Sequence, residues 1–178
     1  KKGFKYLIEA MPEVLNEFPE AKLVFIGYGP KETELKTQVK NLALEENIIF
    51  VGGQSRSDLS RYYATADIFI GPSIVAEGGD TEGQPAAFIE AMASKTAIIA
   101  SDVGGIKDMV KNEETGLLIH QKDPKAITKA IITLCKDSAL KQQLEQNGKE
   151  HIIKFFRWQA VAEQYMGIYE NQEKEISS

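Results

Sequence analysis

The sequence predicts an α/β domain with a Rossmann-like, doubly wound parallel sheet and extra C-terminal helices. Short, continuously apolar runs recur through the first 120 residues, which is the pattern of strands buried on both faces. Segments with helical periodicity lie between these runs. Strands that alternate with helices form parallel sheets through right-handed crossovers, so a doubly wound sheet is the expected architecture.

The strands are predicted where the runs are short, apolar and rich in β-branched residues. These runs are residues 22–27, 47–52, 67–72, 96–101 and 115–120. The apolar face from Phe4 to Phe18 predicts a helix before the first run, which Pro12 should kink or interrupt. Further amphipathic helices are expected between the other strands.

After residue 120 only helices are predicted, at residues 124–136, 138–147 and 157–173. Trp158, together with Phe155 and Phe156, is expected to anchor these terminal helices. Residues 173–178 are polar and are predicted to fray.

Composition and charge narrow the function. The chain has 178 residues, 43% of them hydrophobic, which suits one domain, and its net charge of -5 argues against a nucleic-acid surface. No apolar run approaches the ~20 residues of a membrane span. The single cysteine, Cys135, suits a reducing cytosol, and the two histidines form no metal-binding pattern.

Glycine-containing loops follow four of the predicted strands, and ligands of open parallel sheets bind beyond the carboxyl ends of strands. The loops are residues 27–30, 52–55, 72–85 and 101–105. Glycine amides can approach an anion closely, although glycine after a strand is also ordinary turn chemistry. None of the loops is a Walker or dinucleotide-binding motif.

Two glutamates are the distinctive feature of the loop at residues 72–85 and of the helix predicted after it. Glu82 lies before the helix, and Glu90 interrupts the apolar sequence FIEAMA about two turns inside it. A carboxylate on a helix packed against a sheet needs a partner, and the two hydroxyls of a vicinal diol can supply one. The alternative is a surface helix whose acidic first turn complements the helix dipole.

The stretch GPSIVAEGGDTEGQPAAFIEAMASKTAIIASDVGGIKDMVKNEETGLLI resembles the C-terminal domain of family 4 retaining glycosyltransferases, which have the two-domain GT-B fold. Glu82 and Glu90 match the E-x7-E motif of that family. The resemblance extends over nearly the whole chain. It implies the donor-binding domain of an enzyme that transfers a hexose from a UDP- or GDP-sugar to an acceptor hydroxyl, in bacterial polysaccharide or glycoconjugate synthesis.

The resemblance also implies roles for single residues. Glu90 would hold the ribose hydroxyls, Glu82 would contact the donor sugar, and Lys2 would pair with the diphosphate. Sugar hydroxyls and diphosphate would be bound around the start of the helix, by Gly83, Gln84, Ala86 and Ala87. The nucleobase would lie against Gly27, Gly29, Gly52 and Gln54, and neither a metal nor a further cofactor would be needed. Gly83-Gln84-Pro85 departs from the Phe-Gly that often follows the first glutamate, which leaves the sugar preference open.

The chain opens on Lys1-Lys2-Gly3 and enters a helix, whereas a doubly wound domain normally begins with a strand. Residues 1–178 are therefore expected to be a single nucleotide-sugar-binding domain truncated before its first strand. The glycan or lipid-linked acceptor would be held by an absent N-terminal domain, so this chain alone would be inactive. The expected location is the cytoplasm, or the inner face of its membrane. The alternatives are a non-catalytic nucleotide-sugar-binding module and a GT-B sugar-nucleotide epimerase.

Overall fold

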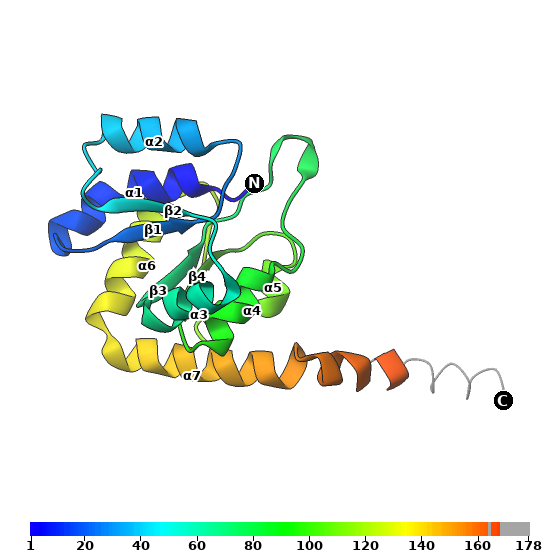
Figure 1. The fold of residues 1–178 in the computed structure, drawn as a ribbon. Helices are drawn as coiled ribbons and strands as arrows, with labels where there is room; N and C mark the ends of the chain where they lie inside the picture. The colour runs from blue at the N-terminus through cyan, green and yellow to red at the C-terminus, as the bar shows by residue number, and fades with distance from the viewer. Residues whose placement is uncertain (164, 168–178) are drawn as a thin grey trace, which may run out of the picture.

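The computed structural model describes residues 1–163 and 165–167, and within them it confirms the α/β class (Figure 1). The strands are β1 (Leu23–Ile26), β2 (Ile48–Gly52), β3 (Ile68–Gly71), β4 (Ala97–Ser101) and β5 (Leu117–Ile119). The helices are α1 (Phe4–Glu17), α2 (Glu32–Asn41), α3 (Arg56–Thr65), α4 (Ala86–Ala93), α5 (Ile106–Met109), α6 (Pro124–Lys136) and α7 (Ser138–Phe155). A short 3-10 turn, Glu77–Gly79, lies in the loop after β3. All of the predicted strands are present.

The strands pair in parallel, as expected, but in two separate ladders. β1 pairs with β2, and β3, β4 and β5 form a second sheet with β4 in the centre. Among the described residues, no ladder joins β1 to β3. The predicted single sheet is therefore divided between its first two and its last three strands.

β4 separates the two halves of the hydrophobic core. All five of its residues are buried, and successive side chains point to opposite faces of the sheet. Ile99 packs into the cluster built with α1 and α6, and Ile98 packs into the cluster built with α4 and α5. This is the layer structure of a doubly wound domain, with helices on both faces of a parallel strand.

The expectation that every strand is buried on both faces holds fully for β4 and in part for β3 and β5, whose half-buried side chains pack into both clusters, but it fails for β1 and β2. Val24 in β1 is 37% exposed and Ile49 in β2 is 41% exposed. Their aromatic neighbour Phe25 is buried and stacks on Phe50 with ring centroids 5.1 Å apart. One face of the β1–β2 pair is thus packed and the other is partly open to solvent.

The helices differ from prediction at three places. Helix α1 passes through Pro12 as one element, so of the predicted kink or interruption the interruption is excluded. Helix α7 continues past residue 147 to Phe155, because Gly148 lies inside it and packs within reach of Met92. Trp158 is 89% exposed and does not anchor the terminal helices. The predicted polar tail at 173–178 lies outside the described residues, as does the end of the helix predicted at 157–173.

Gly71 at the end of β3 is required by the packing of α4. A Cβ atom there would come within 2.1 Å of the Phe88 ring, and Phe88 is 2% exposed. We expect Gly71→Ala to lower the free energy of unfolding by about 1–3 kcal/mol, since overpacking a close-packed core forces side chains out of their rotamers. Urea unfolding monitored by circular dichroism measures this change. Gly167→Ala is the control, because no atom of the described residues, its chain neighbours apart, lies within 4 Å of where a Cβ on Gly167 would be. Equal stability of the two variants would contradict the packing argument.

Candidate functional site

The N-terminal residues are fixed against the loop that follows β3. Gly3 caps α1 with a φ of 68°, and a Cβ atom there would come within 1.8 Å of the Pro72 carbonyl oxygen. Only glycine tolerates both this backbone conformation and this contact. The Ile74 N–H also donates to the Lys1 carbonyl at 2.9 Å. The chain thus enters the domain alongside the carboxyl end of β3.

This entry places Lys2 next to Glu82. The Lys2 ammonium nitrogen lies 3.1 Å from Glu82 Oε1, and the two side chains are 52% and 9% exposed. That carboxylate oxygen makes no hydrogen bond of good geometry, so the lysine charge is what compensates for its burial. About half of the Lys2 side chain is in contact with solvent, so a second anion can reach its ammonium group.

Glu82 is held from its other side by the loop between β4 and α5. The Gly105 N–H donates to the Glu82 carbonyl at 3.1 Å. Gly104 has a φ of 53°, and a Cβ atom on it would come within 2.1 Å of the same carbonyl oxygen. The glycines expected to lie near a ligand therefore serve to position the backbone of Glu82.

Helix α4 starts directly after this loop and presents an uncapped N-terminus. Its N-cap is Pro85, no side chain caps it, and its first turn contains no acidic residue. Helices α2 and α3 instead have acidic side chains in their first turns, Glu32, Glu34 and Asp58. The proposed explanation of an acidic first turn that complements the α4 dipole is therefore wrong. Free N–H groups and a positive helix end are features that suit an anion, and around them Gly83, Gln84 and Ala86 are exposed and Ala87 is half-buried.

Glu90 lies elsewhere on α4 than the sequence predicted. It is the fifth residue of the helix, just over one turn in, and it is exposed. Its neighbour is Tyr63 of α3, a residue for which the sequence predicted no role in the site. Burial, the Glu90 charge and a hydrogen bond to Glu90 raise the pKa of the Tyr63 hydroxyl above its ordinary value. Tyr63 is itself fixed, because its ring meets Phe69 edge-on and its carbonyl accepts from the Thr96 hydroxyl at 2.7 Å.

The loops after β1 and β2 lie side by side. The Gly27 N–H donates to the Gly52 carbonyl at 2.8 Å, and both glycines have positive φ. Gly29 is exposed in the same loop. The Gln54 side chain donates to the Val51 carbonyl at 2.8 Å, so its amide is turned back onto its own strand.

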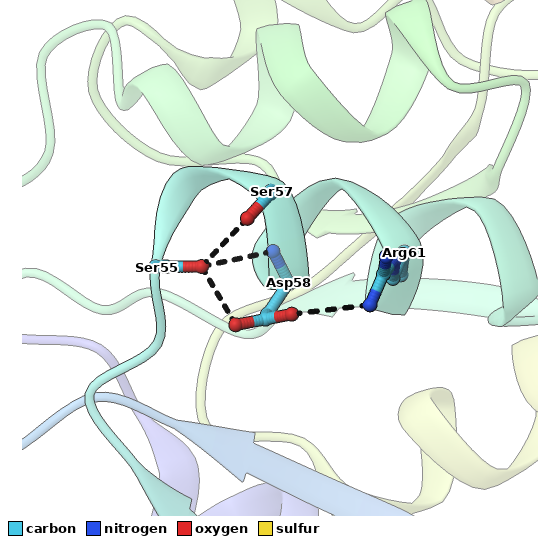
Figure 2. Close-up of polar contacts among 4 residues, drawn as sticks. All are labelled: Ser55, Ser57, Asp58 and Arg61. Carbon is cyan, nitrogen blue, oxygen red and sulfur yellow. Dashed lines mark hydrogen bonds and ion pairs between the residues drawn. The ribbon is translucent and has the colours of Figure 1, made fainter.

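Ser55 ends the second loop and begins α3 (Figure 2). Its hydroxyl accepts from the Asp58 N–H at 3.2 Å and lies 2.6 Å from the Asp58 carboxylate, which also pairs with Arg61. This cap fixes the end of the loop that contains Gly52 and Gln54. The predicted base-binding residues therefore lie on a locally rigid part of the backbone.

The structure thus brings Lys2 to Glu82 and Gly27 to Gly52, whereas Glu90 lies beside Tyr63. Within residues 1–163 and 165–167, no group of three or more histidine, cysteine, aspartate or glutamate side chains could hold a metal ion. None of the helices in the part of the chain that the structure describes has the length and apolar character that crossing a bilayer requires.

Comparison with known proteins identifies the family. The model of the family "Glycosyl transferases group 1" matches residues 1–151. The chain is 29% identical over 173 residues to a GDP-mannose-dependent monoacylated alpha-(1-6)-phosphatidylinositol monomannoside mannosyltransferase of Corynebacterium glutamicum, covering 97% of this chain and 45% of that protein.

Two solved structures are similar in fold and in sequence. The sucrose-phosphate synthase of Thermosynechococcus elongatus matches with a TM-score of 0.78 and 30% identity, over 98% of this chain and 43% of that one. The C-terminal domain of a glycosyl transferase group 1 family protein from Francisella tularensis matches with a TM-score of 0.76 and 29% identity, over 88% of this chain and 80% of that one.

The chain spans less than half the length of the curated relatives it matches. Where the matched structure is a C-terminal domain alone, by contrast, the chain covers most of it. The chain belongs to the group 1 (family 4) glycosyltransferases and has the fold of the C-terminal half of their GT-B architecture.

Proposed function

We propose that this chain binds the sugar donor of a retaining glycosyltransferase, which moves a hexose from a UDP- or GDP-sugar to an acceptor hydroxyl. The observation that supports this proposal most strongly is the Lys2–Glu82 ion pair, located in the loop that leads into the uncapped α4. A buried carboxylate, a half-exposed ammonium group and free helix amides together suit a ligand that has both hydroxyl groups and a diphosphate.

Lys2 and α4 would act on the leaving group. As the bond from the sugar to the diphosphate breaks, negative charge grows on the diphosphate. A lysine 4 Å away contributes roughly 4 kcal/mol of gross attraction at an effective dielectric of 20. A helix N-terminus adds about 0.3–1 kcal/mol when it is exposed. These groups supply the positive charge that departure of the diphosphate requires.

Glu82 and Glu90 would hold the other two parts of the donor. We assign Glu82 to the sugar ring and Glu90 to the ribose diol, because a carboxylate can accept from two hydroxyls at once. Tyr63 supports this role for Glu90, since it orients the carboxylate from a buried and anchored position. Neither glutamate is assigned as a general base.

Relatives support the donor class and the kind of pathway. The C. glutamicum relative is GDP-mannose-dependent, which favours a GDP-sugar among the two donor types considered. That protein acts on a phosphatidylinositol monomannoside, in line with a role of this chain in the synthesis of a polysaccharide or glycoconjugate. A glycan or a lipid-linked glycan is the proposed acceptor class.

We further propose that the chain belongs to a longer protein, in which a preceding segment adds a strand between β1 and β3 and an N-terminal domain binds the acceptor. Three observations support this. β1 and β3 are not paired to each other, the Lys1 carbonyl already accepts from Ile74 beside β3, and the relatives are more than twice as long as their matched parts.

Glu90→Ala should weaken binding of the nucleoside diphosphate about 10- to 100-fold, because a bond to a charged group contributes roughly 1.5–3 kcal/mol. Glu82→Ala should instead lower kcat by at least about tenfold, with a smaller effect on nucleotide affinity. Titration calorimetry with UDP and GDP, and initial rates of the full-length enzyme, separate these effects. Glu150→Ala on α7 is the matched control. Wild-type affinity and rate in both glutamate variants would overturn the site assignment.

Lys2→Ala in the full-length enzyme should lower kcat about 10²–10³-fold, by analogy with the loss of one group that stabilises a developing anion. Lys1→Ala is the matched control, because it removes the adjacent lysine. Lys1 pairs at 3.3 Å with Asp80, whose side chain is 65% exposed, and losing an exposed ion pair should change kcat little. Equal rates for the two variants would argue against a role of Lys2 at the diphosphate.

Tyr63→Phe removes the hydroxyl and leaves the buried ring in place. If the hydroxyl orients Glu90, nucleotide affinity should fall about 2- to 10-fold, the usual contribution of one hydrogen bond. Combining Tyr63→Phe with Glu90→Ala should give no further loss, since the hydroxyl then has no carboxylate to orient. Additive losses in calorimetric titrations would show that Tyr63 acts independently of Glu90.

A further inference from the structure

Tyr28 is a large aromatic side chain that projects from the carboxyl end of β1 into solvent. It is 83% exposed, whereas the other aromatic residues nearby, Phe25 and Phe50, are buried or half-buried. Exposure of single apolar residues is common, but this one lies beside the loop that begins at Gly52. Its position at a ligand-binding edge of the sheet calls for an explanation.

The ring of Tyr28 lies over the backbone of Gly52 and Gly53. A Cβ atom on Gly52 would come within 2.9 Å of the Tyr28 hydroxyl oxygen and 3.1 Å of Cε1. A Cβ atom on Gly53 would come within 2.9 Å of Cε2, on the opposite side of the ring. The hydroxyl end of the ring and both of its edges therefore lie close to the glycine pair, while most of the Tyr28 side chain remains in contact with solvent.

The backbone around this ring is fixed. The Gly27 N–H donates to the Gly52 carbonyl at 2.8 Å, which ties the loop that contains Tyr28 to the loop beneath it. The β1–β2 register shifts after Phe25, so that Ile26 is opposite Gly52. Cβ atoms on Gly27 or Gly29 would meet no described atom within 4 Å apart from their chain neighbours, so no other element crowds the loop on either side of Tyr28.

An exposed aromatic ring on a backbone that is hydrogen-bonded in place can stack against flat, planar groups. A base stacked on an aromatic side chain gains about 5- to 100-fold in affinity, and every nucleobase offers a face for such stacking. In the loop after β2, the Gln54 side chain is not free to bind a base, because its amide donates to the Val51 carbonyl. The phosphates have their own partners at Lys2 and α4.

We propose that Tyr28, seated on Gly52 and Gly53, is the platform on which the nucleobase of the donor stacks. This inference rests on the proposed function, and it adds a side chain that determines affinity for the nucleoside. Stacking depends on the ring face and not on a pattern of hydrogen bonds, so Tyr28 supports uracil and guanine alike.

Calorimetric titration of the full-length protein with UDP, GDP and inorganic pyrophosphate tests the proposal. Tyr28→Ala should weaken UDP and GDP about tenfold and leave pyrophosphate unchanged, while Tyr28→Phe should stay within about twofold of wild type. Gly53→Ala should also weaken both nucleotides, because its Cβ atom displaces the ring while the backbone at Gly53 carries no positive φ. Trp158→Ala removes another exposed aromatic residue and serves as the control.

The outcomes separate this inference from the proposed function. If the wild-type protein binds UDP or GDP and Tyr28→Ala binds them equally well, the stacking role is wrong and the donor site stands. An equal loss of pyrophosphate affinity in Tyr28→Ala would also overturn it, since the ring would then act on the phosphate site. If the wild-type protein binds neither nucleotide, both the stacking role and the proposed function fall.

Discussion

Gly3 lies so close to the Pro72 carbonyl oxygen that no residue with a Cβ atom could replace it without moving the chain, and its φ is positive as well. This contact determines where α1 begins and where the chain passes β3. It therefore also determines the position of Lys2, one residue earlier, beside the buried carboxylate of Glu82. A change at Gly3 would act on the ion pair without touching either of its members.

The sequence predicted which segments form strands, but it did not predict which faces of those strands other elements cover. Every predicted strand is present, because short apolar runs bounded by loops have few other uses in a globular domain. Strands β1 and β2 are partly open on one face, however, since the apolar character of Val24 or Ile49 does not show whether a helix covers it. The helix predicted to end at residue 147 continues through Gly148 in α7, where the lack of a side chain lets the helix approach Met92.

For the site, too, the sequence predicted where the residues lie but not which groups they contact. The spacing of Glu82 and Glu90 pointed to the loop after β3 and to α4, and the loop and helix lie there. Which groups these carboxylates meet depends on contacts between distant parts of the chain: Lys2 is 80 residues from Glu82 in sequence, and Tyr63 is 27 residues from Glu90. Tyr28 was missed for a related reason, because a turn sequence does not show that the ring of one loop rests on the glycines of another.

The loop between β3 and α4 is attached near both ends, and Asp80 also pairs with Lys1, but its two glycines, Gly78 and Gly79, are uncrowded. Val75 donates to the Gln121 side chain at 2.8 Å, and Glu82 accepts from Gly105 at 3.1 Å. Between these anchors, Gly78 and Gly79 both have positive φ, and nothing lies within 4 Å of where their side chains would be. Such a tip tolerates insertions. A small fluorescent tag could therefore be built into it as a reporter of the neighbouring site, without disturbing the packed body of the domain.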